Sequence, residues 1–227
     1  MKRQTYLPEK IILWLSKDQF PTDGSIPQSL WSRVDELFEI RMVDGDIKSH
    51  KKYYYAANEY LDKYLLLIDD DIFYPTDMVE KVIKAQEEYP DAVICRYGYK
   101  KTYDSNCILK SYNDWIPVYK DYIGKDFFFG SGGGTLIMPQ LLYHDLINRD
   151  LFMKLTPTAD DVWLNAMANL SGVNIIKISS GLLCPIAQKN CERLSNINLG
   201  NLQNDTQIDN VGSYYQERFV FNATGNR

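Results

Sequence analysis

The hydrophobic residues of this chain fall into short unbroken runs and into segments where they recur every three or four positions. Unbroken runs occupy residues 11–15, Leu65–Ile68 and Ala92–Cys95, and a run interrupted by Asn174 and Lys177 occupies residues 173–178. Runs of this length are typical of strands buried on both faces, as in a parallel sheet. A shorter run at 40–43 predicts one more strand.

Between these runs the spacing favours helices. The predicted helices cover residues 25–38, 48–61, 76–88, 140–152 and 158–170. Strands that alternate with helices in this way indicate an α/β domain, with a mostly parallel, Rossmann-like central sheet flanked by helices. We expect one such domain over residues 1–187, followed by a polar C-terminal extension over 188–227. The tyrosine-rich stretch 96–128 is irregular and is expected to lie over a functional site.

Composition narrows the class of protein. The chain has 227 residues, of which 45% are hydrophobic and 24% charged, as in ordinary globular proteins. Its net charge of −5 argues against a nucleic-acid partner, and two histidines leave little scope for a histidine-based metal site. Because the sequence shows neither a signal peptide nor an apolar run near ~18 residues, we expect a cytoplasmic protein.

Three consecutive acids follow the run at Leu65–Ile68, namely Asp69, Asp70 and Asp71. Adjacent carboxylates repel one another, and at the carboxyl edge of a sheet a cation can neutralise them. Mg²⁺ is usually held by one or two carboxylates together with substrate phosphates. The alternatives are a solvated acidic turn and a phosphotransferase motif, and Phe73 disfavours the second.

The segment 130–134 reads Gly-Ser-Gly-Gly-Gly. Glycine allows a ligand to approach the backbone closely, but it also allows the unusual dihedral angles of a tight strand entry. The segment lacks the spacing of a Walker A loop or a dinucleotide-binding loop. Both interpretations stay open at this point.

A second acidic pair, Asp160 and Asp161, stands at the start of the predicted helix 158–170. One interpretation is helix capping, with Thr158 as the N-cap and Asp161 completing a capping box. The other is that one of these acids is a general base, presented to an incoming hydroxyl group. Trp163 fits either a core position or a wall that stacks on a sugar.

Lys52 lies upstream of the three acids on the predicted helix 48–61. Its ammonium group could reach a phosphate, or it could belong to a solvated basic face together with Lys48 and Lys51. We assign Lys52 to donor binding.

Taken together, the aliphatic run ending in Asp-Asp-Asp-Ile-Phe-Tyr-Pro, the Gly-Ser-Gly-Gly-Gly segment and Pro-Thr-Ala-Asp-Asp-Val-Trp resemble a known family. They resemble bacterial nucleotide-sugar glycosyltransferases of the A-type fold, most of all the family-two-like enzymes of surface polysaccharide synthesis. The resemblance covers about residues 5–180. It implies a metal-dependent enzyme that moves a sugar from a nucleoside-diphosphate donor to a saccharide or lipid-linked saccharide, with inversion.

The resemblance also implies roles for individual residues. Asp69 and Asp70 would lie against the nucleoside and ribose of the donor, and Asp71 would bind Mn²⁺ or Mg²⁺ at the diphosphate. Asp161 would deprotonate the acceptor hydroxyl. The residues that would border the acceptor are Gly132, Gly133, Trp115 and Asp160.

One departure from the family concerns the first strand and helix, which normally precede the segment matching residues 4–8. We expect the sheet to lack that strand beside Leu65–Ile68. The alternative function is therefore a catalytically inactive, glycosyltransferase-like binding or assembly subunit. Association with the inner face of a membrane and with a second copy of the chain are further expectations.

Overall fold

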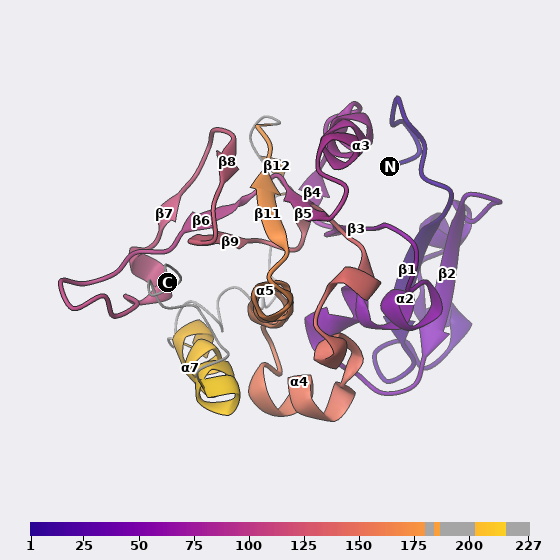
Figure 1. Ribbon diagram of the computed structural model, residues 1–227. Coiled ribbons are helices and arrows are strands. Elements are labelled where there is room, and N and C mark those ends of the chain that lie inside the picture. Colours follow the sequence, from indigo (N-terminus) through magenta and orange to yellow (C-terminus); the bar gives the residue numbers. More distant parts are fainter. Residues whose placement is uncertain (180–183, 187–202, 217–227) are drawn as a thin grey trace.

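The computed structural model describes residues 1–179, 184–186 and 203–216, and these form a mixed α/β arrangement (Figure 1). Its largest sheet has five strands in the order β3-β10-β5-β11-β8. Strands β5 and β11 run parallel, whereas β10 is antiparallel to both of its neighbours and β8 is antiparallel to β11. The strands are β3 (Leu65–Ile68), β10 (Gly133–Ile137), β5 (Ala92–Cys95), β11 (Asn174–Lys177) and β8 (Tyr122–Ile123).

The prediction of a mostly parallel central sheet is therefore wrong, although the α/β class is confirmed. An unbroken aliphatic run indicates that a strand is covered on both faces, but it does not indicate the direction of its neighbours. Strand β3 lies at one edge of the sheet. Among the described strands it pairs with β10 alone, so its other edge carries no strand partner.

Helices cover both faces of this sheet. Alternate residues of each strand point to opposite sides, so each strand packs against helices on both faces. Ile94 of β5 packs against the helix α3 (Met78–Glu88) on one face. Val93 and Cys95 join the larger hydrophobic cluster on the other face, which includes α4 (Arg149–Leu155), α5 (Asp160–Ser171) and α7 (Gln203–Tyr215). Since α7 contributes Ile208 to that cluster, part of the predicted polar extension 188–227 belongs to the core.

A separate two-stranded sheet pairs β1 (Ile11–Ser16) with β2 (Phe38–Val43) in parallel. Although both strands are apolar, nearly all their residues are half-buried, and none belongs to either core cluster. The predicted helix 25–38 is wrong: the segment contains a 3₁₀ helix at Asp23–Ser25 and a single turn, α1 (Gln28–Trp31), before β2 begins. A helical spacing of apolar residues does not form a helix where no core covers them.

The predicted helix 48–61 is present in two pieces, a 3₁₀ helix at Lys48–Lys52 and α2 (Tyr54–Glu59). Tyr53, Ala56 and Ala57 are buried, as their spacing predicted. The expected helix 140–152 is replaced by two 3₁₀ helices, Pro139–Leu141 and His144–Ile147, which precede α4.

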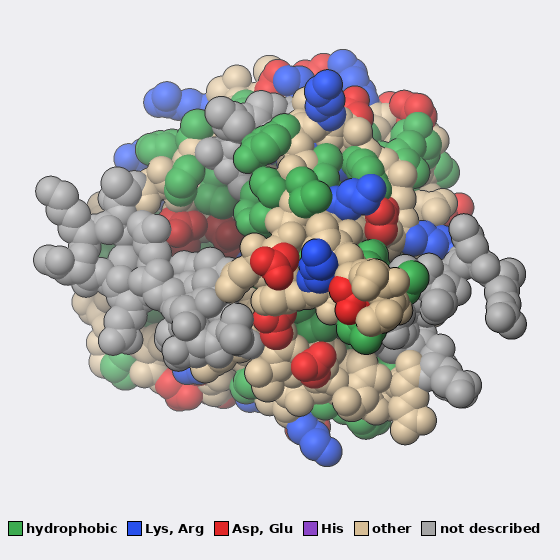
Figure 2. Space-filling view, turned by 90° about the vertical axis from the view of Figure 1, so that its left-hand side faces the viewer, with side chains coloured by type: hydrophobic (Ala, Val, Ile, Leu, Met, Phe, Trp, Pro, Cys, Tyr) green, Lys and Arg blue, Asp and Glu red, His purple; other side chains and the backbone are tan. Residues whose placement is uncertain are grey.

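The tyrosine-rich stretch forms a further layer, which Figure 1 places beside the five-stranded sheet. Its small sheet has the order β7-β6-β9 and a 3₁₀ helix at Tyr112–Asp114 precedes β7. Hydrophobic side chains gather on part of the face in Figure 2, and exposed ones in this stretch are Ile108, Ile116, Tyr119 and Ile123. The remaining strands are β6 (Gly98–Lys100), β7 (Ile116–Pro117), β9 (Phe127–Phe129), β4 (Ile72–Phe73) and β12 (Cys184–Pro185), of which the last two pair.

Candidate active site

The loop after β3 carries the three acids and is tied to the glycine-rich segment. The backbone N–H of Asp69 donates hydrogen bonds to the Tyr74 hydroxyl at 2.7 Å and to the carbonyl of Gly132 at 3.2 Å. The Tyr74 hydroxyl donates in turn to the Gly132 carbonyl. Burial raises the pKa of Tyr74, so this phenol keeps the proton that it donates.

The glycine-rich segment packs against the carboxylate of Asp69. Gly132 is buried, and a methyl group on its Cα would overlap the Asp69 carboxylate. Gly133 begins β10 opposite Ile68, and its carbonyl accepts a hydrogen bond from Arg96 at 3.3 Å. The segment therefore forms the entry to β10, where Gly132 lies against Asp69 and Gly133 accepts from Arg96. That these glycines border an acceptor stays a prediction.

Lys52 joins the two acidic groups that are far apart in the sequence. Its Nζ lies 2.7 Å from Oδ1 of Asp69 and 3.3 Å from Oδ2 of Asp160, and it donates to the Ser131 hydroxyl at 3.0 Å. The Lys52 side chain is only 17% exposed. Burial lowers the pKa of Lys52, but Asp160 and Asp69 outweigh that effect and the net change is upward. This lysine is not part of a solvated basic face.

Asp160 and Asp161 open α5, and both point towards Ser131. Oδ2 of Asp160 accepts from the Ser131 hydroxyl at 2.7 Å, and Oδ1 of Asp161 accepts from the Ser131 backbone N–H at 2.6 Å. The N-cap of α5 is Ala159, and no side chain caps it. The predicted capping box with Thr158 is thus absent, and the general-base role of these acids stays a prediction.

The two acids have opposite protonation behaviour. Burial acts to raise the pKa of Asp160, but the charge of Lys52 and the hydrogen bond from Ser131 outweigh it, and the pKa falls below its usual range. Burial and the adjacent charge of Asp160 raise the pKa of Asp161 to about 6. A pair of carboxyl groups whose pKa values are shifted in opposite directions is typical of acid–base sites.

His50 and Tyr53 support the site from behind. His50 is fully buried, and its Nε2 lies 2.6 Å from the carbonyl of Thr156, so Nε2 carries the proton. Its Nδ1 then accepts from the Tyr53 hydroxyl at 3.1 Å. Burial lowers the pKa of His50, which keeps the ring neutral. The hydrogen bond from His50 to Thr156 joins the segment that carries Lys52 to the residues just before α5.

Asp70 and Asp71 lie beside this cluster in sequence but take no part in its contacts. Asp70 is exposed and Asp71 is half-buried. Among the described residues, neither carboxylate has a hydrogen-bond or ion-pair partner, and the backbone carbonyl of Asp71 accepts from Ile186 at 2.7 Å. Two uncommitted carboxylates fit a hard cation that also takes phosphate oxygens. Within the described ranges, no three acidic, histidine or cysteine side chains are grouped closely enough to hold a metal by themselves.

Two tryptophans are core residues. Trp115 is 4% exposed, and its indole N–H donates to the Lys110 carbonyl at 3.0 Å while its ring packs on Phe128. The expectation that Trp115 borders the acceptor is corrected, because its ring is buried among other aromatic residues. Trp163 is fully buried as well, so its core interpretation is correct.

The residues that sequence reasoning missed are Ser131, His50, Tyr53 and Tyr74. Ser131 is the one non-glycine residue within 130–134, and His50 is one of two histidines, so each carried a weak signal. Tyr97 is a further addition: its ring lies where a side chain on Gly130 would stand, and burial raises its pKa with a smaller contribution from Asp161.

A comparison of the chain with models of protein families and with curated proteins finds no match. Over the described residues, every helix is too short or too polar to cross a lipid bilayer.

Proposed function

We propose that this protein is a metal-dependent glycosyltransferase, which moves a sugar from a nucleoside-diphosphate donor to a hydroxyl group of a saccharide or lipid-linked saccharide. One observation carries the proposal. Buried Lys52 brings the acid-bearing loop after β3 within salt-bridge distance of the acidic start of α5. Asp69 and Asp160 are more than ninety positions apart in the chain. A shared active site explains why both segments carry carboxylates.

On the donor side, Asp70 and Asp71 have the uncommitted carboxylates that would hold Mn²⁺ or Mg²⁺, with Asp71 as the principal ligand. The metal, when bound, offsets the charge of the leaving nucleoside diphosphate. Asp69 and Lys52 form the floor between the two halves of the site. Lys52 keeps Asp160 ionised, and it is placed to meet a donor phosphate if Asp69 turns towards the ribose.

On the acceptor side, Asp161 is the proposed general base. Its pKa of about 6 is close to the pH at which such a base is most effective. The acceptor O–H proton moves to the Asp161 carboxylate as the acceptor oxygen forms its bond to the anomeric carbon. The bond from that carbon to the diphosphate oxygen breaks, and attack from the opposite face inverts the centre. Ser131 holds the Asp161 carboxylate through its backbone N–H.

The A-type fold belongs to the same proposal. The acids at the end of β3, the glycine-rich entry to β10 and the acidic start of α5 follow one another in the order of that family. The sheet has strands in both directions, with β10 antiparallel to its neighbours. It therefore supports this fold only at the level of an α/β arrangement.

The second candidate is a catalytically inactive binding or assembly subunit. Two observations favour it. The half-buried sheet β1-β2 is outside both hydrophobic clusters. Among the described strands, none pairs with the second edge of β3. Weakened donor binding would follow if that region is needed for the nucleoside.

A thermal-shift panel tests the proposal. Nucleoside diphosphate sugars carrying uridine, guanosine or thymidine, and a cytidine monophosphate sugar, are each added with Mn²⁺ or with EDTA. We expect one donor to raise the melting temperature with Mn²⁺ only, and Asp71→Asn to abolish that rise without lowering the melting temperature of the free protein. If no donor shifts the wild-type protein, the inactive-subunit candidate replaces the enzyme.

A further inference from the structure

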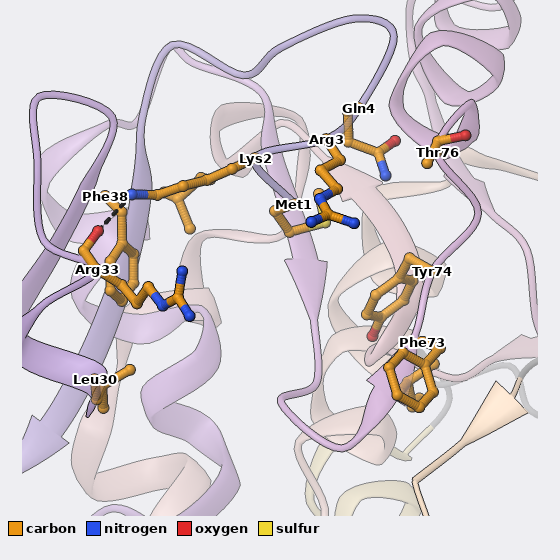
Figure 3. Close-up of a pocket in the computed structure, with 12 residues that line it drawn as sticks. Met1, Lys2, Arg3, Gln4, Leu30, Arg33, Phe38, Phe73, Tyr74 and Thr76 are labelled. Carbon is orange, nitrogen blue, oxygen red and sulfur yellow. Dashed lines mark hydrogen bonds between the residues drawn. The ribbon is translucent and has the colours of Figure 1, made fainter. Parts of the chain in front are cut away.

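A cavity lies between the N-terminal segment, the sheet β1-β2 and strand β4, next to the acidic site. Its volume is about 640 Å³, within the usual size range of small-molecule sites. Figure 3 shows Arg3 and Arg33 reaching into it from different sides, with Tyr74 and Phe73 across from Arg33. Its lining includes three basic residues, Lys2, Arg3 and Arg33, and the hydrophobic residues Leu30, Phe38 and Phe73.

The charge of this lining is entirely positive, although the protein as a whole carries −5. Lys2 is neutralised by Asp35, with Nζ 2.7 Å from Oδ2. Arg3 and Arg33 have no ion pair and no side-chain hydrogen bond with any described residue. Guanidinium groups are shaped for bidentate binding of phosphate and carboxylate. Two of them facing one space, without an acid in the lining, favour an anion as the missing partner.

Apart from Gln4 and Thr76, the rest of the lining is hydrophobic. Leu30, Phe38 and Ile72 are half-buried, and Phe73 is 66% exposed. Exposed apolar side chains that gather around a concave space mark binding sites more often than single exposed residues do. A bare inorganic anion would use the arginines and leave this surface in contact with water. A ligand with a hydrocarbon body would use both parts.

We propose that this cavity binds the phosphate of an alkyl phosphate, with Arg3 and Arg33 on the phosphate and the hydrocarbon chain against Leu30, Phe38 and Phe73. The phosphate can come from a free amphiphile or from a lipid headgroup at a membrane surface. The proposal does not depend on the glycosyltransferase activity, because neither arginine belongs to the cluster around Lys52. The two sites adjoin through Tyr74, which lines the cavity and bonds to Asp69, and through Ile72 and Phe73, which line the cavity and directly follow Asp71 in the chain.

The test is direct binding by calorimetry of the intact chain with decyl phosphate below its micelle concentration. Inorganic phosphate and decanol are titrated as the two halves of the ligand. Sedimentation with phosphatidylcholine vesicles, with and without phosphatidic acid, distinguishes a lipid headgroup from the free amphiphile. The variants are Arg3→Gln and Arg33→Gln, and the control is Arg149→Gln, an exposed arginine at the start of α4 outside the cavity.

We expect decyl phosphate to bind at least ~10-fold more tightly than inorganic phosphate or decanol, since each supplies one half of the contacts. Each arginine variant should weaken it by ~10-fold, as expected for loss of a charge-assisted hydrogen bond, and Arg149→Gln should not. Asp71→Asn should bind decyl phosphate normally, whatever its effect on a nucleotide sugar. Unchanged affinity in the double arginine variant, or equal affinity for decanol, would overturn the proposal.

Discussion

Replacing Lys52 by methionine removes the only described cation between Asp69 and Asp160 while keeping the length of the side chain. The variant loses two ion pairs, at 2.7 and 3.3 Å, and one hydrogen bond to Ser131 at 3.0 Å. Asp160 is then left as a buried charge without a counter-ion, since its side chain is 7% exposed. Asp69, at 34% exposed, is partly screened by water and contributes less.

Removing one partner of a buried pair costs about 3–5 kcal/mol, and the lower end applies here because Asp69 is partly exposed. We expect Lys52→Met to lower the free energy of unfolding by about 3 kcal/mol at pH 7.5. For a domain of this size that corresponds to a melting temperature lower by ~6–12 °C. Urea denaturation followed by tryptophan fluorescence measures the free energy directly.

The stability deficit of Lys52→Met should depend on pH in a defined direction. Without Lys52, burial raises the pKa of Asp160, as it already raises that of Asp161. A carboxyl group with a raised pKa in the folded state destabilises the protein at high pH, and the penalty disappears once it is protonated. The deficit of Lys52→Met should therefore shrink between pH 7.5 and pH 5.

The matched control is Lys84→Met, which removes an exposed lysine paired with Glu80 four residues earlier on α3. Its effect on the free energy of unfolding should be far smaller than that of Lys52→Met, because water screens this exposed pair. If Lys52→Met is no more destabilising than this control, or if its deficit grows towards pH 5, the assignment of Lys52 as the counter-ion of Asp160 is refuted.

Three further predictions concern single residues. Gly132→Ala should displace the Asp69 carboxylate and cost about 1–3 kcal/mol, whereas Gly24→Ala, whose added methyl group would have no neighbour closer than 3.8 Å, should be nearly neutral; equal unfolding free energies would contradict the close approach. Because the pKa of Asp161 is about 6, kcat/KM for transfer should rise with pH through that value. The stability that the protein loses through Asp161 as the pH rises from 4 to 6 should not be lost in Asp161→Asn. An unchanged pH–stability profile in that variant would refute the raised pKa. Trp115→Ala should cost about 3–5 kcal/mol in urea denaturation, as for a core aromatic residue, and a variant of wild-type stability would restore the idea that Trp115 serves a ligand.

The strands could be predicted from sequence where aliphatic residues are consecutive, and β3, β5 and β11 were found in this way. Their directions could not, because pairing depends on how the chain returns to the sheet, and β10 returns antiparallel through a glycine-rich turn. Helix 25–38 failed for a related reason: its apolar spacing was regular, but no core lies opposite it.

The candidate site was predictable in its acids and only partly in its contacts. The positions of Asp69, Asp160 and Asp161 after a buried strand and at a helix start followed from local pattern. That Lys52 lies between them depends on tertiary packing, to which the buried pair His50 and Tyr53 contributes. The glycines were read as ligand-facing because a sequence does not show which side chain occupies the space that a missing Cβ leaves.

The most direct test of the proposed function is the release of nucleoside diphosphate from the donor selected by thermal shift, measured with Mn²⁺ and an acceptor saccharide. The wild-type protein should turn over, and turnover should stop with EDTA, in Asp71→Asn and in Asp161→Asn, while both variants keep a cooperative unfolding transition. Undiminished turnover in Asp71→Asn and Asp161→Asn would contradict the assignment of this acidic site as the active site.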